Sequence, residues 1–224
     1  MGKVSMRTRT ALLACLSGLA VLLGSSVGAA QAREDAAAIV VAATSAPASQ
    51  TTTSTVDCVQ GDGTTGSCKA TMSIDVSAAT RASLVQIESD PNLTLAQRSQ
   101  MVASGTITFY YRTFSHTVSS WYGGWAWSEG HSGGYYYNGS KVWLAVANYG
   151  YKGWHQCNYG SGFGYSIKVT FCGERQRPDL GTNVIAEYDN FEVHAVAKGI
   201  PIYDSKSMWV NLYPSGVGYY HWMN

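Results

Sequence analysis

Residues 135–144, YYYNGSKVWL, place aromatic and β-branched residues on both sides of a turn signal. Asn138 and Gly139 tolerate the positive φ angles of tight hairpin turns, so this pair is among the strongest short hairpin signals. The tyrosines before the turn and the residues from Lys141 to Leu144 after it are typical of paired strands. The stretch therefore predicts two antiparallel strands.

Similar strand patterns occur on both sides of this hairpin. Met72, Ile74 and Val76 alternate with polar residues, which predicts a strand with one buried face. Further strands are predicted at residues 106–118, 165–171, 191–196, 208–213 and 217–221. Turn residues separate them at short intervals, which is typical of an antiparallel β-sandwich or barrel. We therefore expect a mainly β fold with one short helix, preceded by an extended N-terminal arm.

The one helix is expected at residues 94–104. Thr94 and Gln97 have the spacing of a capping box, and Gly105 supplies a stop. Residues 57–68, DCVQGDGTTGSC, predict instead a glycine-rich loop or hairpin that a disulfide closes.

The first 32 residues have the composition of a secretory signal peptide. Basic residues come first, an apolar run follows at residues 11–23, and residues 30–32 read A-Q-A, as at a cleavage site. The apolar run is too short to cross about 30 Å of hydrocarbon. We expect cleavage before Arg33 and a secreted, extracellular protein.

Charge and cysteine content agree with export. Without the first 32 residues the chain has 12 basic and 14 acidic residues, a net charge of −2, so a nucleic-acid partner is not favoured. The four remaining cysteines, an even number, favour disulfides: Cys58, Cys68, Cys157 and Cys172. Three pairings are possible, and proximity favours joining the first two and the last two. A zinc site is the competing interpretation, but no C-x-x-C pair is present and only Cys157 has a nearby histidine, His155. We expect no metal and no cofactor.

Aromatic residues are unevenly distributed, since all 27 lie between Phe109 and Trp222. Residues 33–56 contain none and are dominated by Ala, Thr, Ser and Val. This composition predicts an extended arm ahead of a β domain at residues 57–224.

Within that arm, residues 36–43 (AAAIVVAA) are apolar, with Ile39, Val40 and Val41 at the centre. A solvent-exposed linker gains nothing from such a stretch. Three interpretations stay open: insertion into a partner protein as an added strand, docking on its own domain, or neither.

No stretch carries a complete catalytic motif. Residues 130–134, GHSGG, resemble the G-D-S-G-G segment of trypsin-like proteases, but histidine replaces the aspartate and no matching triad partners are present, so we expect a loop between strands. The carboxylates Glu129, Glu187 and Asp189 are not spaced as a glycosidase pair. Metal-ligand spacing is also missing among the histidines, which are His116, His131, His155, His194 and His221. We expect that the protein is not an enzyme.

The aromatic clusters are the stronger functional signal. Three tryptophans lie within residues 121–127, and three tyrosines follow at 135–137. Because successive strand residues face opposite sides, we expect at least one of these tyrosines to face outward. Residues 172–178 (CGERQRP) predict a cysteine-anchored turn with two arginines, either a plain polar turn or the type of rigid loop that protease inhibitors use. The predicted binding surface consists of Trp121, Trp125, Trp127, Tyr135, Tyr136, Tyr137, Arg175 and Arg177.

The order of signal peptide, Ala/Val-rich arm and disulfide-bonded β domain resembles the adaptor subunit of the umbrella toxin particles that filamentous actinobacteria secrete. The resemblance is one of layout over most of the chain after the signal peptide, without an aligned motif. In that family the arm inserts into the helical-repeat stalk of a toxin subunit, and the globular part holds a lectin subunit. The resemblance implies that residues 36–43 contact a stalk and that a loop such as 173–178 meets a lectin.

Three hypotheses follow for the function. The first is a secreted, non-enzymatic adaptor that links other exported proteins through its arm and its β domain. The second is a carbohydrate-binding module that uses Trp121, Trp125 and Trp127 as a stacking platform. The third is a protease inhibitor built on Arg175 and Arg177. The expected partners are other secreted proteins or carbohydrate, with no nucleic acid and no membrane after cleavage.

Overall fold

The computed structural model of the chain describes residues 37–42, 46–59, 64–106, 108–122, 125–148, 151–157, 160–174, 180–197 and 200–223. The predicted signal peptide, Arg175 and Arg177 lie outside the described residues.

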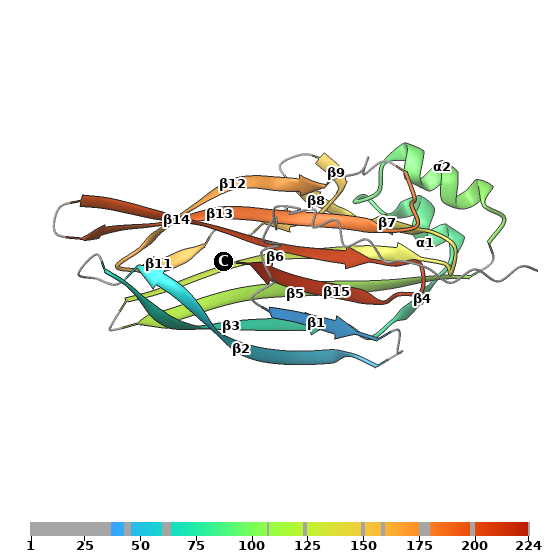
Figure 1. Cartoon of the computed structure of the whole chain (residues 1–224). Coiled ribbons are helices and arrows are strands. Elements are labelled where there is room, and N and C mark those ends of the chain that lie inside the picture. Colours follow the sequence, from blue (N-terminus) through green and yellow to red (C-terminus); the bar gives the residue numbers. More distant parts are fainter. Residues whose placement is uncertain are drawn as a thin grey trace, which may run out of the picture. The chain divides into compact units, whose positions relative to one another are not determined.

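The described chain is mainly β and forms two antiparallel sheets (Figure 1). The first sheet has the order β1 (Ala37–Val41), β15 (Gly218–Met223), β14 (Ile200–Leu212), β13 (Ile185–Ala197) and β12 (Ser166–Glu174). The second has the order β10 (Gln156–Cys157), β6 (Trp125–Tyr137), β5 (Phe109–Tyr122), β3 (Thr65–Val76) and β2 (Ala48–Val59). Short strands complete the set: β11 (Ser161–Phe163) and β7 (Val142–Leu144) on β6, β4 (Thr80–Ala82) on β5, and the separate pair β8 (Val146–Asn148) and β9 (Tyr151–Trp154). The predicted antiparallel β fold is confirmed.

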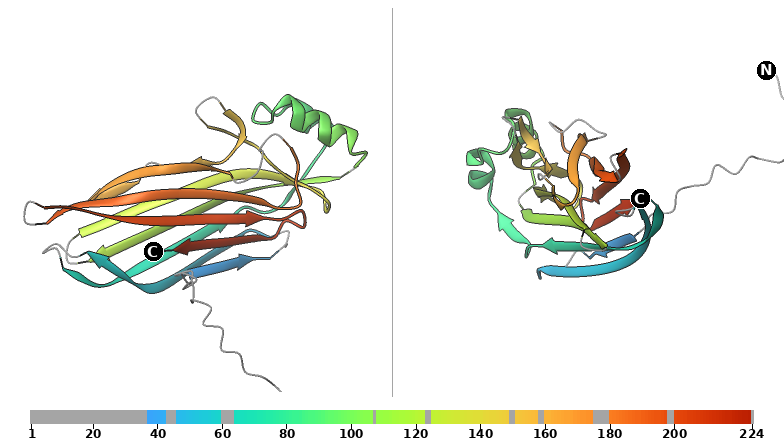
Figure 2. Two further views of the ribbon diagram at one scale, coloured as in Figure 1. Left: turned by 45° about the horizontal axis from the view of Figure 1, so that its top comes forward. Right: turned by 90° about the vertical axis from the view of Figure 1, so that its left-hand side faces the viewer.

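The main hydrophobic core lies between the facing sides of the two sheets (Figure 2). Met72 and Ile74 of β3 point into it and are at most 1% exposed. Phe191, Val210 and Trp222 reach the same core from the first sheet. Every second residue of these strands is buried because successive strand residues face opposite sides. The two sheets therefore pack as a β-sandwich.

A second core covers one end of the outer side of the second sheet, beneath α1 (Leu84–Ser89) and α2 (Leu95–Ala103). Tyr136 and Trp143 of the sheet pack there with Ile87 and Met101 of the helices. The Tyr136 hydroxyl donates to Asp90 Oδ2 at 2.7 Å. Apolar residues on both faces of the sheet are therefore buried at this end.

This second core corrects the expectation for the three tyrosines. Tyr135 and Tyr137 belong to the inter-sheet core and Tyr136 to the second core, and none is more than 7% exposed. Their sides alternate as expected, but the helices cover the outer side, so none of the three faces solvent.

The helix prediction is partly confirmed. In α2, Thr94 and Gln97 form the predicted capping box, and Gly105 follows with φ 64°. The expectation of a single helix is wrong, because α1 precedes it with a second capping box between Ser83 and Gln86. That S-x-x-Q spacing is the sequence signal that would have revealed α1.

The predicted arm is incorporated into the sandwich. Strand β1 pairs antiparallel with β15, where Ile39 lies opposite Tyr220. Ile39 and Val41 are 7% and 1% exposed, whereas Val40 between them is 51% exposed. Docking on its own domain is therefore the outcome for this segment, and the expectation that Ile39 and Val41 contact a partner is corrected.

The predicted boundary at residue 57 also falls inside a strand. Strand β2 runs from Ala48 to Val59 and pairs along its length with β3. Residues 48–56, which we assigned to the arm, are therefore part of the second sheet. A Thr- and Ser-rich composition is compatible with an edge strand whose outer side faces water.

The GHSGG segment is not a loop but the middle of β6. His131 faces the core and is fully buried, and the neighbouring Ser132 pairs with Ser115 of β5. A Cβ atom at Gly133 would lie 2.6 Å from the Phe114 ring, so the absence of a side chain lets that ring lie across the strand. These glycines serve packing within the sheet.

Both disulfides that proximity favoured are confirmed. Cys58–Cys68 joins β2 to β3, and Cys157–Cys172 joins β10 of the second sheet to β12 of the first. Two disulfides are compatible with an extracellular protein. Among the described residues, no helix is long and apolar enough to span a bilayer.

Candidate functional site: an aromatic and hydroxyl groove on the second sheet

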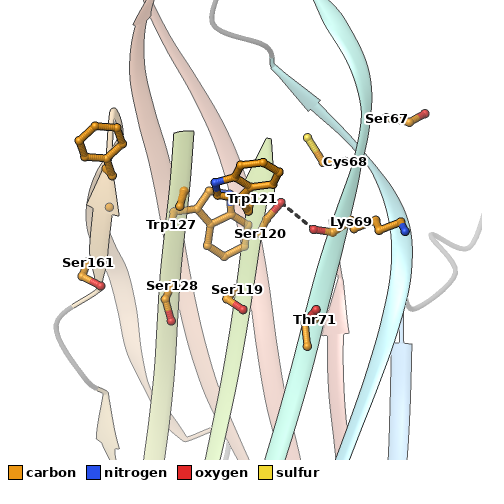
Figure 3. A pocket seen from close by; sticks show the side chains of 13 residues that line it. Ser67, Cys68, Lys69, Thr71, Ser119, Ser120, Trp121, Trp127, Ser128 and Ser161 are labelled. Carbon is orange, nitrogen blue, oxygen red and sulfur yellow. Dashed lines mark hydrogen bonds between the residues drawn. The ribbon is translucent and has the colours of Figure 1, made fainter. Parts of the chain in front are cut away.

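A groove of about 960 Å³ lies on the outer side of the second sheet, across β3, β5, β6 and β11 (Figure 3). It is at the end of the sheet that the Cys58–Cys68 disulfide borders, since Cys68 is among the residues that line it. The side chains that form it come from neighbouring strands in register, so the pairing of the strands fixes their positions.

One row of the groove alternates aromatic and small side chains. Trp121 of β5 pairs with Ala126 of β6, and Ala126 pairs with Phe163 of β11. Trp121 and Phe163 are 66% and 74% exposed. Because two strand spacings separate them, their backbones lie roughly 10 Å apart. Two exposed rings therefore flank a shallow position above Ala126.

The next row consists of hydroxyl side chains. Thr71 pairs with Ser119, Ser119 with Ser128, and Ser128 with Ser161, so that four strands each contribute one residue (Figure 3). Thr53 of β2 extends the row, and its Oγ1 lies 3.3 Å from Oγ1 of Thr71. These residues alternate with inward-facing core residues, which explains why a Ser/Thr-rich sequence still forms buried strands.

The groove is almost neutral. Lys69, which pairs with Trp121, is the single charged residue among the described residues that line it. The Ser120 hydroxyl donates to the Lys69 carbonyl oxygen at 3.1 Å and so ties β5 to β3 beside the groove. The site therefore offers aromatic faces and neutral hydrogen-bonding groups rather than a charged surface.

Only part of this site was predicted from the sequence. Trp121 and Trp127 both line the groove, but Trp127 is only 6% exposed and packs against Phe191 and Trp222 between the sheets. The side chain of Trp125 lies outside the described residues. Phe163 was missed, although an aromatic residue in the glycine-rich run GSGFG was a usable signal, because glycines leave its ring uncovered.

A group of titratable side chains lies elsewhere, inside the inter-sheet core. Glu129 lies beside Asp189, and His116 Nδ1 lies 2.8 Å from His131 Nε2. The remaining pair is His155 with Glu187, whose side chain contacts Nδ1 of the imidazole. Each of these side chains is at most 1% exposed.

Burial moves the pKa values of this group toward the neutral forms. It raises the pKa of Glu129 to about 7 and, together with the charge of Glu129, that of Asp189 to about 8. It raises the pKa of Glu187 well above its usual value. Burial also lowers the pKa of His116 to about 3 and that of His155 to about 4.

These carboxylates are the ones that sequence analysis considered for a glycosidase. The structure brings Glu129 and Asp189 together, a pairing that their spacing did not predict. Both are enclosed by the sandwich, so a sugar chain has no access to them in this arrangement. Their described geometry favours a structural role over acid–base chemistry on a substrate.

One candidate set of metal ligands is present among the described residues. Ligand atoms of His155, Cys157 and Cys172 lie within 4.8 Å of one another. The two sulfur atoms are joined to each other in a disulfide, however, and a metal binds thiolates. As arranged here, the group is therefore a histidine beside a disulfide.

Comparison of the chain with protein-family models, curated proteins and solved structures finds no match.

Proposed function

We propose that the protein is an exported, non-enzymatic binding protein whose groove on the second sheet binds carbohydrate. The supporting observation is the arrangement of the two rows: exposed Trp121 and Phe163 flank Ala126, and hydroxyl side chains run beside them in register. This keeps the second hypothesis from the sequence and replaces its platform of three tryptophans.

The chemistry of the groove suits a sugar chain. One face of a sugar ring presents C–H groups, which pack on the negative face of an aromatic ring, and its edge presents hydroxyls. The rings of Trp121 and Phe163 can accept two such faces at a spacing on the scale of a disaccharide. Ser119 and Ser128 then offer neutral donors and acceptors to the sugar hydroxyls. A site for a polyanion would instead carry several cationic side chains. Among the described residues that line this groove, Lys69 is the one cation.

The adaptor hypothesis required an arm that enters another protein. Ile39 and Val41 fill the core of their own sandwich, so arm insertion is not part of this proposal. The proposal keeps from the adaptor hypothesis the expectation that the protein is exported. The inhibitor hypothesis depended on Arg175 and Arg177, which lie outside the described residues.

The test is affinity electrophoresis of the exported protein in gels that contain cellulose, chitin, xylan or α-glucan derivatives. We expect retardation by at least one of them, and a loss of affinity of about tenfold in each of the variants Trp121→Ala and Phe163→Ala. Tyr203→Ala is the matched control, because Tyr203 is 68% exposed but lies on β14 of the first sheet. Equal losses in all three variants, or no retardation by any glycan, would overturn the proposal.

A further inference from the structure

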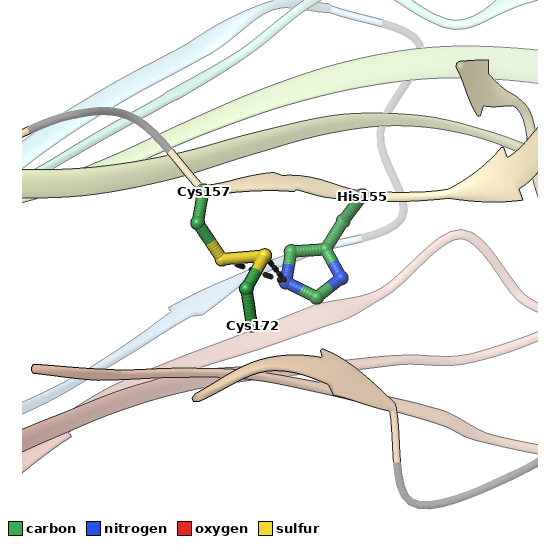
Figure 4. A group of neighbouring side chains, drawn as sticks. All are labelled: His155, Cys157 and Cys172. Atoms are coloured by element: carbon green, nitrogen blue, oxygen red, sulfur yellow. Dashed lines mark hydrogen bonds between the residues drawn. A yellow bond between two sulfur atoms is a disulfide. The ribbon is translucent and has the colours of Figure 1, made fainter. Parts of the chain in front are cut away.

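The Cys157–Cys172 disulfide lies against a buried histidine (Figure 4). Nε2 of His155 is 3.4 Å from Sγ of Cys157 and 3.6 Å from Sγ of Cys172. Both distances are within hydrogen-bonding range for sulfur. The imidazole can therefore exchange a proton with either sulfur once the S–S bond opens.

The Glu187 carboxyl group orients this imidazole, together with a hydrogen bond to the backbone of Tyr188. Glu187 of β13 contacts Nδ1 of His155, and both side chains are completely buried. Nε2 is thereby aimed at the disulfide. A base or acid next to sulfur, oriented in turn by a third group, is the arrangement by which proteins assist reactions at a thiol.

The two cysteine residues differ in exposure. Cys157 is 7% exposed, whereas Cys172 is partly exposed. We therefore expect an external thiol to attack Sγ of Cys172. Sγ of Cys157, which is closer to Nε2 of His155, is then the leaving group.

The second disulfide has different surroundings. Sγ of Cys58 lies 3.4 Å from the carbonyl oxygen of Gly66, a group that carries no proton to give. The chain thus contains an internal comparison, one disulfide beside an imidazole and one beside a carbonyl.

We infer that Cys157–Cys172 is a thiol–disulfide exchange site, in which His155 supplies the proton and Glu187 is a positioning residue. An external thiolate forms an S–S bond with Cys172 Sγ as the Cys157–Cys172 bond breaks. The electron pair stays on Cys157 Sγ, which takes the proton from Nε2, while Nδ1 takes the proton that Glu187 carries. A second external thiol then displaces Cys172. Two thiols are oxidised to one disulfide, and the protein disulfide is reduced to two thiols.

Burial raises the pKa of Glu187 well above its usual value, which agrees with a carboxyl group that holds this proton at neutral pH. Thiolate leaving groups depart faster when they are protonated or hydrogen-bonded in the process. The exchange reaction at Cys157 should therefore depend on His155 far more than the reaction at Cys58 does.

The test is timed reduction of the folded, full-length protein by dithiothreitol, with alkylation of the released thiols and peptide mass spectrometry for each disulfide. We expect Cys157–Cys172 to be reduced at least tenfold faster than Cys58–Cys68 at pH 7. We also expect His155→Gln to slow the first reaction at least tenfold and to leave the second unchanged.

His131→Gln is the matched control, because it removes a buried imidazole whose ring centre is 5.5 Å from that of His155. A variant that merely loosens the core exposes both disulfides and accelerates their reduction, so slowing cannot arise from partial unfolding. Slowing in His155→Gln but not in His131→Gln supports the inference. An unchanged or faster rate in His155→Gln, or reduction of Cys157–Cys172 no faster than that of Cys58–Cys68, would overturn it.

Discussion

Glu129 of β6 and Asp189 of β13 lie beside each other in the inter-sheet core, where the charge of Glu129 raises the pKa of Asp189. Neither side chain is more than 1% exposed. Two ionised carboxylates cannot occupy such a site together, so at least one of them carries a proton in the folded protein. The stability of the sandwich should therefore depend on pH in a definite direction.

We expect the free energy of unfolding to fall as the pH rises from about 6.5 to 8. The pKa values of Glu129 and Asp189 are raised from 4.5 and 3.8 to about 7 and about 8. Above about pH 6.5, where histidines are neutral in both states, the folded state thus binds more protons than the unfolded state, and the stability that these protons provide is lost as the pH rises through the folded pKa values. Glu129→Gln keeps an uncharged donor beside Asp189, so its stability should fall less over this range. Urea denaturation at intervals between about pH 3 and 8 measures the slopes of both proteins.

The acid limb supplies the control for this prediction. The pKa of His116 is lowered to about 3 and that of His155 to about 4, so the folded state binds fewer protons than the unfolded state below about pH 4, where the carboxyl groups are protonated in both states. Stability should fall there with decreasing pH in the wild type and in Glu129→Gln alike. If the free energy of unfolding fell equally with rising pH in the wild type and in Glu129→Gln, Glu129 and Asp189 would not be the cause of the alkaline loss of stability.

Arg112 should be among the most sensitive positions in the chain. Its guanidinium is fully buried and donates to the carbonyl oxygens of Ser77 and Ala46 at 2.9 Å each, and to those of Ala42 and Gly216 at 3.4 Å. It thus holds the connection between β1 and β2 against the turn before β15.

Arg112→Met removes these donors and leaves the carbonyl oxygens buried without them. We expect a loss on the order of 3 kcal/mol in the free energy of unfolding, measured with urea. Arg81→Met is the control, because Arg81 is exposed and donates to Thr108 Oγ1 at 3.2 Å, so its loss should be within about 0.5 kcal/mol. Similar losses in the two variants would contradict the role of Arg112 in holding the connection between β1 and β2.

Local patterns in the sequence were sufficient where one short segment determines its own conformation. Asn138 bonds the backbone N–H groups of Ser140 and Lys141 in the predicted hairpin, and Thr94 caps the predicted helix. Both features depend on residues within four positions of each other. The strand positions followed in the same way from alternation.

Burial was harder to predict where it depends on distant segments. Tyr136 alternates to the outer side of its sheet, and only the arrival of α1 and α2 encloses it. Trp127 and Trp121 are six residues apart on a hairpin, yet one packs between the sheets and the other is exposed. For the same reason the groove could not be derived, since Trp121 and Phe163 become neighbours through the register of β5, β6 and β11.

The position of β1 gives a prediction with an adjacent control. Val41 is 1% exposed in the core, and Val40 is 51% exposed on the other side of the strand. Val41→Asp places a carboxylate in that core and should lower the free energy of unfolding by about 3 kcal/mol or more. Val40→Asp should change it by less than about 0.5 kcal/mol. Equal, small effects in a denaturation experiment would mean that this segment does not contribute a strand in solution.

The hydroxyl row can be tested separately from the aromatic rings. Ser128 lies at the centre of the row, between Ser119 and Ser161, and Ser132 lies on the same side of β6 outside the groove. If sugar hydroxyls bond to the row, Ser128→Ala should weaken glycan binding by about three- to tenfold, which corresponds to one hydrogen bond. Ser132→Ala should leave binding unchanged, and neither variant should alter the melting temperature by more than a few degrees. Because alanine keeps the shape of the row and removes one donor, unchanged affinity in Ser128→Ala would assign the binding energy to Trp121 and Phe163 alone.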